Sequence, residues 1–276
     1  MGDRNAPGAV QVITEPDYEA MIIGAHPDDD DFGAGATSAL WAKQGKKVVW
    51  VVMTNGVEGG EAPDMDDEEF MLTREQEQRA AAEVYGVKAV EFLRFPDGHL
   101  TNNEETRKAI VRLIRKYRPR VVLTHDPSTF LMAPDPNEEP EATGHINHPD
   151  HRATGSIVLD AIFPYVGNPR SYRDLIAQGY MPYRVHELYL FYTERSNTYV
   201  DVTETIDIKA QGLKCHVTQF GPDVDFSSSL RERAAKTAKE AKEKLNLDMQ
   251  FAEAFRRVKL HIPPTPADEA PTEVAE

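Results

Sequence analysis

Two short clusters of histidine and aspartate stand far apart in this chain of 276 residues. The first, residues 25–31, reads Ala-His-Pro-Asp-Asp-Asp-Asp, and the second, residues 148–151, reads His-Pro-Asp-His. Imidazole and carboxylate groups are the ligands that a catalytic zinc ion takes when one coordination position must stay open for water. His26 and Asp29 lie three residues apart in the first cluster, and His151 completes a set of two histidines and one carboxylate. The sequence therefore predicts a metal-dependent hydrolase.

The run of four aspartates, residues 28–31, has a simpler interpretation as a solvated surface loop, because most charge runs are solvated. The residues on either side of the run favour a ligand-binding site instead. The apolar segment 20–24 precedes the run and is typical of a buried strand, and the small residues of 33–36 follow it. In open α/β sheets, ligands bind where such a strand gives way to a helix. A divalent cation would also offset the repulsion among the clustered carboxylates.

The composition is that of an acidic globular protein. The formal net charge is −15 and the pI is about 5.1, which argues against nucleic acid as a partner because a polyanion needs a basic face. No apolar run approaches the roughly 18–20 residues of a membrane helix, so membrane insertion is not expected. The one cysteine, Cys215, excludes an intrachain disulfide and suits the cytoplasm, where we expect the protein to reside. The oligomeric state is open, with a homo-oligomer among the options.

Short apolar runs alternate with longer amphipathic segments over the first half of the chain. The apolar runs are rich in β-branched residues and predict strands at 21–23, 48–53, 89–93 and 121–124. The amphipathic segments between them predict helices at 35–44, 73–85 and 104–117. This alternation predicts an α/β, Rossmann-like fold with a mostly parallel sheet flanked by helices.

The second half of the chain is less regular. The proline-rich segment 126–149 is predicted to be a long active-site loop that carries His148 and His151 to a helix beginning near Arg152. Residues 187–192 and 199–202 predict two further strands, and residues 204–217 predict a helix.

The C-terminal part is predicted to end the domain. Segment 230–259 predicts one long charged helix that docks through Phe251, Phe255 and Val258. We expect residues 1–262 to form a single α/β domain and the acidic residues 263–276 to be a disordered tail.

The two clusters resemble the signature of a known family. His-Pro-Asp-Asp at 26–29 followed by Gly-x-Gly at 33–35, with His-Pro-Asp-His at 148–151, is similar to the LmbE-like or PIG-L family of zinc-dependent N-acetylglucosaminyl deacetylases. Weaker counterparts are Thr-Asn-Gly at 54–56, Arg-Glu-Gln-Glu at 74–77, Phe-Pro-Asp-Gly at 95–98 and His-Val-Thr-Gln at 216–219. The resemblance covers residues 19–220 and implies a hydrolase that removes the N-acetyl group from an N-acetylglucosamine-type sugar or conjugate.

The resemblance also implies roles for single residues. It implies one zinc ion (Zn2+) per chain, held by His26, Asp29 and His151. It implies Asp28 as the general base, His148 as the histidine that stabilises the transition state, and Asp150 as the carboxylate that orients His148. Because Asp is favoured just before a helix, capping is an alternative or additional role for Asp150.

Further residues are predicted to bind substrate. Arg74 and Asp97 match positions that hold sugar hydroxyls in the family, a task that suits planar, multidentate groups. Their simpler interpretations are a helix-surface arginine and a turn aspartate. His216 is predicted to close the substrate pocket, although a buried structural role is equally compatible. His125 and His145 are predicted to be loop histidines rather than extra ligands.

Two other functions fit parts of the pattern. Clustered Asp and His also build two-metal phosphoesterases, which need more ligands than the two clusters supply and a cationic clamp for phosphate. Gly33 and Gly35 after a strand are similar to a dinucleotide-binding turn, which would make the chain a sugar- or nucleotide-binding module without catalysis. The third glycine of that turn is missing, and aspartates occupy the phosphate position. The number of ions per chain tests the first alternative, and binding of NAD tests the second.

Overall fold

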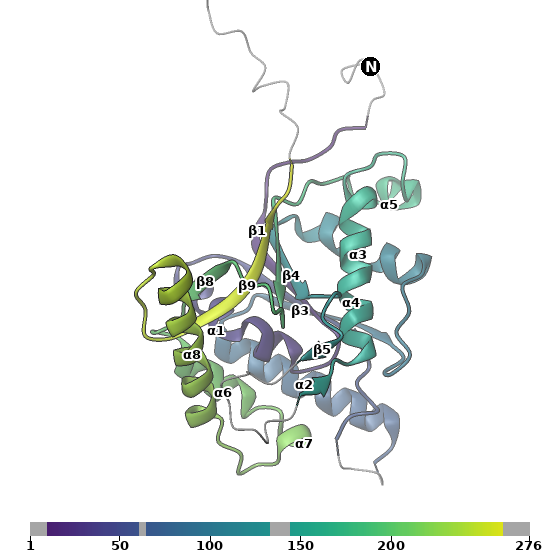
Figure 1. Cartoon of the computed structure of the whole chain (residues 1–276). Coiled ribbons are helices and arrows are strands. Elements are labelled where there is room, and N and C mark those ends of the chain that lie inside the picture. The colour runs from purple at the N-terminus through teal and green to yellow at the C-terminus, as the bar shows by residue number, and fades with distance from the viewer. Residues whose placement is uncertain (1–9, 61–64, 133–143, 262–276) are drawn as a thin grey trace, which may run out of the picture.

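The computed structural model describes residues 10–60, 65–132 and 144–261. A seven-stranded sheet crosses it in the order β3-β2-β1-β4-β7-β9-β8 (Figure 1). The parallel strands are β1 (Tyr18–Gly24), β2 (Val48–Thr54), β3 (Ala89–Phe95), β4 (Pro119–His125) and β7 (Glu187–Phe191). β9 (Ala252–Lys259) runs antiparallel between β7 and β8 (Thr198–Asp201). The predicted α/β class with a mostly parallel sheet is therefore confirmed.

Burial on both faces explains why the central strands are apolar throughout. Every residue of β2 is buried, as are the last five residues of β1. Successive side chains of β1 point to opposite faces of the sheet. Met21 and Ile23 join one core cluster, and Ala20 and Ile22 join the other. A parallel sheet needs such a core on each side, because helices cover both of its faces.

Helices form a layer on each side of the sheet (Figure 1). One layer contains α1 (Asp29–Lys43), α2 (Asp67–Tyr85), α6 (Ile206–Leu213) and α8 (Ser227–Leu245). The other contains α3 (Glu104–Tyr117), α4 (Pro149–Asp160) and the π-helical segment η1 (Ala161–Val166). The remaining described elements are α5 (Arg173–Ala177), α7 (Val217–Phe220), β5 (Leu131–Met132) and β6 (His145–Ile146).

The strands and helices predicted for the first half of the chain are confirmed, with changes at their ends. α1 begins at Asp29 rather than at residue 35, because the aspartates form its first turn. α2 begins at Asp67 rather than at residue 73, because Asp66 caps it by accepting hydrogen bonds from two backbone amides. The predicted helix 204–217 corresponds to α6, which ends at Leu213, and α7 begins only at Val217.

The order of the strands reverses at β1. The chain places β2 and β3 on one side of β1 and then returns to place β4 on the other side. Such a switch point opens a crevice at the carboxyl ends of the strands, where ligands of α/β proteins bind. His26 follows the end of β1, and β4 ends at His125, so histidine stands on both borders of this crevice.

The prediction of one helix over residues 230–259 is wrong in its second half. α8 ends at Leu245, Asn246 adopts a left-handed conformation with a φ of 54°, and β9 follows. Phe251 and Phe255 are buried in two core clusters beside the sheet, whereas Val258 is 36% exposed. The segment forms a strand because both of its edges find partners, in β7 and β8, and such pairing overrides local helix propensity.

β9 also supports α1, the helix that carries the first histidine–aspartate cluster. α1 is interrupted at Ala34, whose φ of −152° is not helical. An interruption leaves backbone amides without helical partners at the start of the second half. Glu253 of β9 accepts hydrogen bonds from the amides of Ala36 at 3.3 Å and Thr37 at 2.8 Å. Lys209 of α6 pairs with the same carboxylate at 2.6 Å, so β9, α6 and α1 are joined by one buried ion pair.

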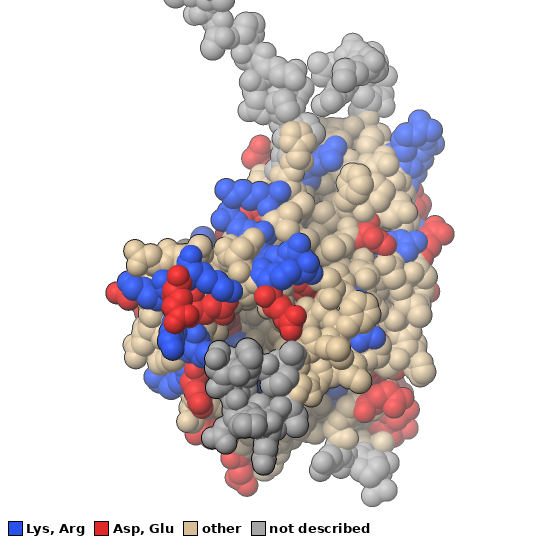
Figure 2. Space-filling model, in the orientation of Figure 1, with Lys and Arg blue, Asp and Glu red and all other residues tan. Residues whose placement is uncertain are grey.

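Two observations describe the helices and one face of the surface. Among the described residues, no helix combines the length and the apolar content needed to cross a bilayer. On the face shown in Figure 2, basic and acidic side chains are interspersed over α8 rather than separated into one basic surface. The expected tail, residues 263–276, and residues 133–143 of the expected active-site loop lie outside the described residues.

Candidate metal centre

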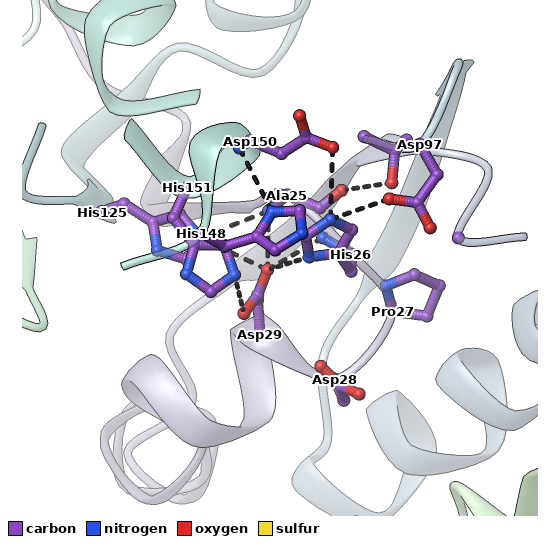
Figure 3. Close-up of polar contacts among 12 residues, drawn as sticks. Ala25, His26, Pro27, Asp28, Asp29, Asp97, His125, His148, Asp150 and His151 are labelled. Carbon is purple, nitrogen blue, oxygen red and sulfur yellow. Dashed lines mark hydrogen bonds and ion pairs between the residues drawn. The ribbon is translucent and has the colours of Figure 1, made fainter. Parts of the chain in front are cut away.

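The two histidine–aspartate clusters meet near the carboxyl ends of β1 and β4 (Figure 3). His26 lies in the turn that leaves β1, and Asp29 is the first residue of α1. On the opposite side, α4 begins directly after His148, whose Nδ1 accepts a hydrogen bond from the amide of Asp150 at 3.2 Å. His148 is thus the cap of α4, and His151 lies in the first turn of this helix.

Asp29 lies between the two predicted histidine ligands. Its Oδ2 is 3.3 Å from Nδ1 of His26, and its Oδ1 is 3.2 Å from Nε2 of His151. The ring centroids of the two histidines are 5.3 Å apart. One carboxylate and two imidazoles from opposite halves of the chain therefore lie side by side, and they offer the oxygen and nitrogen atoms that zinc prefers.

Overlapping groups of described residues bring ligand atoms close enough to share a cation. In each group the ligand atoms lie within 4.8 Å of one another, and the groups are His26, His148 and His151; Asp29, His125 and His151; and His26, Asp97 and Asp150. The predicted ligands fall across the first two groups, since His26 belongs to one, Asp29 to the other and His151 to both. The residues present therefore fit a metal ion, but the predicted set of His26, Asp29 and His151 is not itself one of these groups and stays a prediction.

His125, predicted to be a loop histidine, is part of this centre, and that prediction is wrong. It ends β4, has no exposed surface and stacks on His151 with ring centroids 4.2 Å apart. Its Nε2 lies 3.4 Å from Oδ2 of Asp29, and its Nδ1 has no hydrogen-bond partner in the described part of the chain. The sequence contains one indication of this role: His125 follows a predicted parallel strand at its carboxyl end, as His26 does.

The carboxylate of Asp29 is held in its ionised form. Its Oδ2 accepts backbone hydrogen bonds from Ala25 at 3.0 Å and from His26 at 2.8 Å. Burial opposes the charge, but the neighbouring imidazoles of His151 and His125 outweigh burial and hold the pKa of Asp29 well below its usual range. A metal ligand must be deprotonated, so this environment prepares Asp29 for coordination.

Asp28 points away from the histidines, in contrast to its neighbour Asp29 (Figure 3). Its side chain is 17% exposed, and its Oδ2 lies 3.4 Å from Nη2 of Arg74. Burial and the negative charge of Asp29 raise the pKa of Asp28 to about 6. A carboxylate with such a pKa can exchange a proton near neutral pH, which suits a general base better than a metal ligand.

The carboxylate of Asp150 does not contact His148, contrary to the predicted orienting role. Its Oδ2 accepts a hydrogen bond from the amide of Gly98 at 2.7 Å and lies 3.4 Å from Nε2 of His26. Its Oδ1 accepts a hydrogen bond from the amide of Leu100 at 3.1 Å. The free amides of the turn after β3 draw the carboxylate towards His26, so Asp150 orients a predicted metal ligand instead.

His148 is the exposed histidine of the centre. Its ring meets that of His26 edge-on, with centroids 4.7 Å apart. Partial burial, with the positive charges of His26 and His151, lowers the pKa of His148. The charges of Asp150 and Asp97 act in the opposite direction but are outweighed.

The three predicted substrate-binding residues are buried. Asp97 is 5% exposed, and its Oδ1 lies 3.1 Å from Nε2 of His26. Arg74 is 2% exposed and donates hydrogen bonds to two backbone carbonyls. His216 has no exposed surface, and its Nε2 lies 3.2 Å from Oδ2 of Asp31. Because a sugar reaches these side chains only after rearrangement, their part in substrate binding stays a prediction.

Comparison of the chain with models of known protein families gives a match. The family model described as PIG-L, GlcNAc-PI de-N-acetylase, matches residues 21–162, a range that contains both histidine–aspartate clusters. The chain belongs to this family. The family predicted from the sequence is thereby confirmed.

Relatives of this PIG-L chain are named as deacetylases. Diacetylchitobiose deacetylase of Thermococcus kodakarensis is 32% identical over 75% of this chain and 72% of its own length. The 1D-myo-inositol 2-acetamido-2-deoxy-alpha-D-glucopyranoside deacetylase of Streptomyces scabiei is 26% identical over 78% of this chain and 80% of its own length. The solved structure of N,N'-diacetylchitobiose deacetylase from Pyrococcus horikoshii has a TM-score of 0.74 and 26% identity, and the match covers 91% of this chain and 88% of that one. The predicted class, an amide hydrolase acting on N-acetylated amino sugars, agrees with these relatives.

Proposed function

We propose that this PIG-L protein is a zinc-dependent deacetylase that removes the acetyl group from an N-acetylglucosamine-type sugar or conjugate. The products are acetate and the free amine. The observation that carries the proposal is the position of Asp29, 3.3 Å from His26 and 3.2 Å from His151. The names of the relatives support the substrate class, and the donor atoms support one zinc ion per chain on these three residues.

Amide hydrolysis needs an activated water, a polarised carbonyl group and a proton for the departing amine. Zinc with an open coordination position supplies Lewis acidity towards an acyl oxygen and lowers the pKa of water. Asp28 accepts the proton of the attacking water, because its carboxylate stands beside the ligand Asp29 without facing the histidines (Figure 3). When the C–N bond breaks, the amine takes up a proton that Asp28 returns or His148 delivers.

His148 is suited to act on the substrate directly. It is exposed, whereas His26 and His151 are partly buried and His125 is fully buried. A ring N–H at this position donates a hydrogen bond to the oxygen on which negative charge develops. We assign this role to His148, supported by its position at the start of α4 beside the ring of His26.

The two alternative functions are less well supported. A phosphate group at this centre would face the carboxylates of Asp28, Asp29 and Asp97, and Arg74 is enclosed by backbone groups. The same negative charge disfavours the pyrophosphate of a dinucleotide at the start of α1. One ion per chain is the expected stoichiometry, and two ions would favour the phosphoesterase.

Domain organisation and location are part of this proposal. We place residues 1–262 in one catalytic domain, supported by a single sheet whose strands extend from Tyr18 to Lys259. We place the enzyme in the cytoplasm, supported by its single cysteine, Cys215. The partner is a small N-acetylated amino sugar.

The decisive experiment measures acetate and amine released from N-acetylglucosamine and N,N'-diacetylchitobiose by the zinc-loaded protein. Asp28→Ala is expected to abolish release while the zinc content, measured by atomic absorption, stays at the native level. Asp248→Ala, at a surface side chain that is 93% exposed, is the matched control and is expected to behave as native. Full activity of Asp28→Ala would remove Asp28 from the mechanism. Failure to release amine from any acetylated sugar in a panel would refute the deacetylase itself.

A further inference from the structure

Asp28 occupies a backbone conformation that its side chain disfavours. Its φ is 108° and its ψ is −24°, in the left-handed half of conformational space. A residue other than glycine in such a conformation is strained and persists only where its surroundings enforce it. Some contact must therefore hold the peptide that precedes the proposed base.

That contact comes from two residues on one face of α2. The peptide unit between Pro27 and Asp28 has one carbonyl group and one N–H group. Nη2 of Arg74 donates to the carbonyl oxygen of Pro27 at 2.7 Å, and Oε1 of Gln78 accepts from the N–H of Asp28 at 2.7 Å. Arg74 and Gln78 are four residues apart, so they lie one above the other on the helix.

We propose that Arg74 and Gln78 act as a clamp on the Pro27–Asp28 peptide, and that both are positioning residues for Asp28. The inference rests on the proposed function in so far as Asp28 is the general base. It gives Arg74 a task other than the predicted contact with sugar, and it assigns a task to Gln78, which the sequence did not single out. Both side chains are buried, with exposures of 2% for Arg74 and 0% for Gln78.

The Arg74 half of the clamp is enclosed by the segment after β2. Nη1 of Arg74 donates to the carbonyl oxygen of Gly56 at 2.5 Å. A Cβ atom on Gly56 would lie 2.7 Å from Nη1, and one on Gly59 would lie 2.8 Å from it. The absence of side chains at these two positions therefore makes room for the guanidinium, whose planar fork spans two carbonyl groups at once.

The side-chain amide of Gln78 is held in place by a second hydrogen bond. Nε2 of Gln78 donates to Oδ2 of Asp31 at 2.8 Å, and the same oxygen lies 3.2 Å from Nε2 of His216. With its nitrogen committed to Asp31, the amide must present its oxygen to the N–H of Asp28. A glutamate in place of Gln78 would accept from Asp28 as well but would repel Asp31. This requirement explains why a neutral amide suits the position.

The two halves together set the direction of the Asp28 side chain. Oδ2 of Asp28 lies 3.4 Å from Nη2 of Arg74, the same nitrogen that holds the Pro27 carbonyl. Fixing the peptide on both sides keeps the carboxylate apart from the histidines. A displacement of about 1 Å of a catalytic group can cost about 100-fold in rate, so loss of the clamp should appear in kcat.

The experiment compares Gln78→Met with Gln76→Met in the zinc-loaded enzyme. Gln76 lies on the exposed face of α2 and carries the same substitution away from the clamp. We expect Gln78→Met to lower kcat by about 10–100-fold with KM and zinc content unchanged, and Gln76→Met to match the native enzyme. Arg74→Lys, which keeps the charge but loses the fork, should also lower kcat. A rise in KM alone for Arg74→Lys would support sugar contact and overturn its half of the clamp.

Hydrogen–deuterium exchange separates this inference from the proposed function. Gln78→Met should accelerate exchange in the peptide that contains the Asp28 amide and leave the amides of α2 protected. If the native enzyme releases no amine from any acetylated sugar, the proposed function fails, and the exchange result still tests the clamp. Native exchange at Asp28 in Gln78→Met, or exchange that rises equally throughout α2, would overturn the clamp.

Discussion

Replacing His125 with phenylalanine separates an orienting role from direct metal binding. The native ring stacks on His151 with an angle of 16° between the planes, and phenylalanine keeps this contact. The substitution removes both ring nitrogens, including Nε2, which lies 3.4 Å from Oδ2 of Asp29. Packing is thus conserved, while both polar contacts of Nε2 are deleted: the one with Asp29 and the hydrogen bond that it accepts from the amide of Ala25 at 3.3 Å.

The expected magnitude follows from which oxygen His125 faces. Oδ2 of Asp29 already accepts two backbone hydrogen bonds, whereas Oδ1 faces His151. His125 therefore steadies the side of the carboxylate that is tied to the main chain. Loss of an orienting partner of this kind costs about 10–100-fold in metal affinity, or about 1.4–2.8 kcal/mol. His151→Phe removes a proposed ligand and should abolish stoichiometric binding.

The assay is a titration of zinc against a chromophoric chelator, with native protein and each variant at the same pH. His145→Phe is the control, because His145 lies exposed in β6 and carries the same substitution. It should bind zinc with native affinity. If His125→Phe loses zinc as completely as His151→Phe, His125 is itself a ligand and the set becomes Asp29, His125 and His151. Native affinity in His125→Phe would show that it has no role in the centre.

Two further predictions concern stability. Lys209→Met should lower the free energy of unfolding by about 3–5 kcal/mol, because it leaves Glu253 buried at 8% exposure without its cation. Thermal unfolding followed by circular dichroism tests this, with Lys239→Met at a 76% exposed side chain as the control, and equal melting temperatures for the two variants would contradict it. Glu187 supplies the pH dependence: burial favours its neutral form, but Arg257 at 2.5 Å and Arg120 at 2.8 Å outweigh burial and lower its pKa. Glu187 therefore contributes its full stabilisation at pH values above its unfolded-state pKa of about 4.3. This stabilisation is lost as the pH falls through the lower pKa that Glu187 has in the folded state. Urea unfolding should show a smaller loss of stability on acidification for Glu187→Gln than for the native protein, and parallel losses would count against the ion pairs.

Much of the centre was predictable because its ligands are close in sequence. His26 and Asp29 share one strand-to-helix turn, and His148 and His151 share the start of one helix. Once an alternating strand–helix pattern predicts a parallel sheet, its carboxyl edge is the only place where such turns gather. A long-range contact between Asp29 and His151 then brings the two clusters together.

The residues that were missed act through contacts between distant segments. Gln78 bonds to an amide 50 positions away in sequence, and Glu253 bonds to one 216 positions away. The local sequence around His125 shows only a histidine after an apolar run, which does not identify it as part of the metal centre. The sequence predicts a helix where β9 lies because the charged residues of this segment suit a helix, whereas its strand conformation depends on two partner strands from distant segments.

The geometry also explains how two adjacent aspartates can have different tasks. Asp28 and Asp29 are neighbours, yet the pKa of Asp28 is raised and the pKa of Asp29 is lowered, with burial opposing the charge on both. The difference arises because Asp29 faces imidazoles, while Asp28 is turned towards the Arg74 side by its left-handed backbone. If the clamp on the preceding peptide were lost, Asp28 could relax to a common conformation and move its carboxylate. We therefore expect the proposed deacetylase activity to depend on the backbone conformation at residue 28 in addition to the proposed metal ligands.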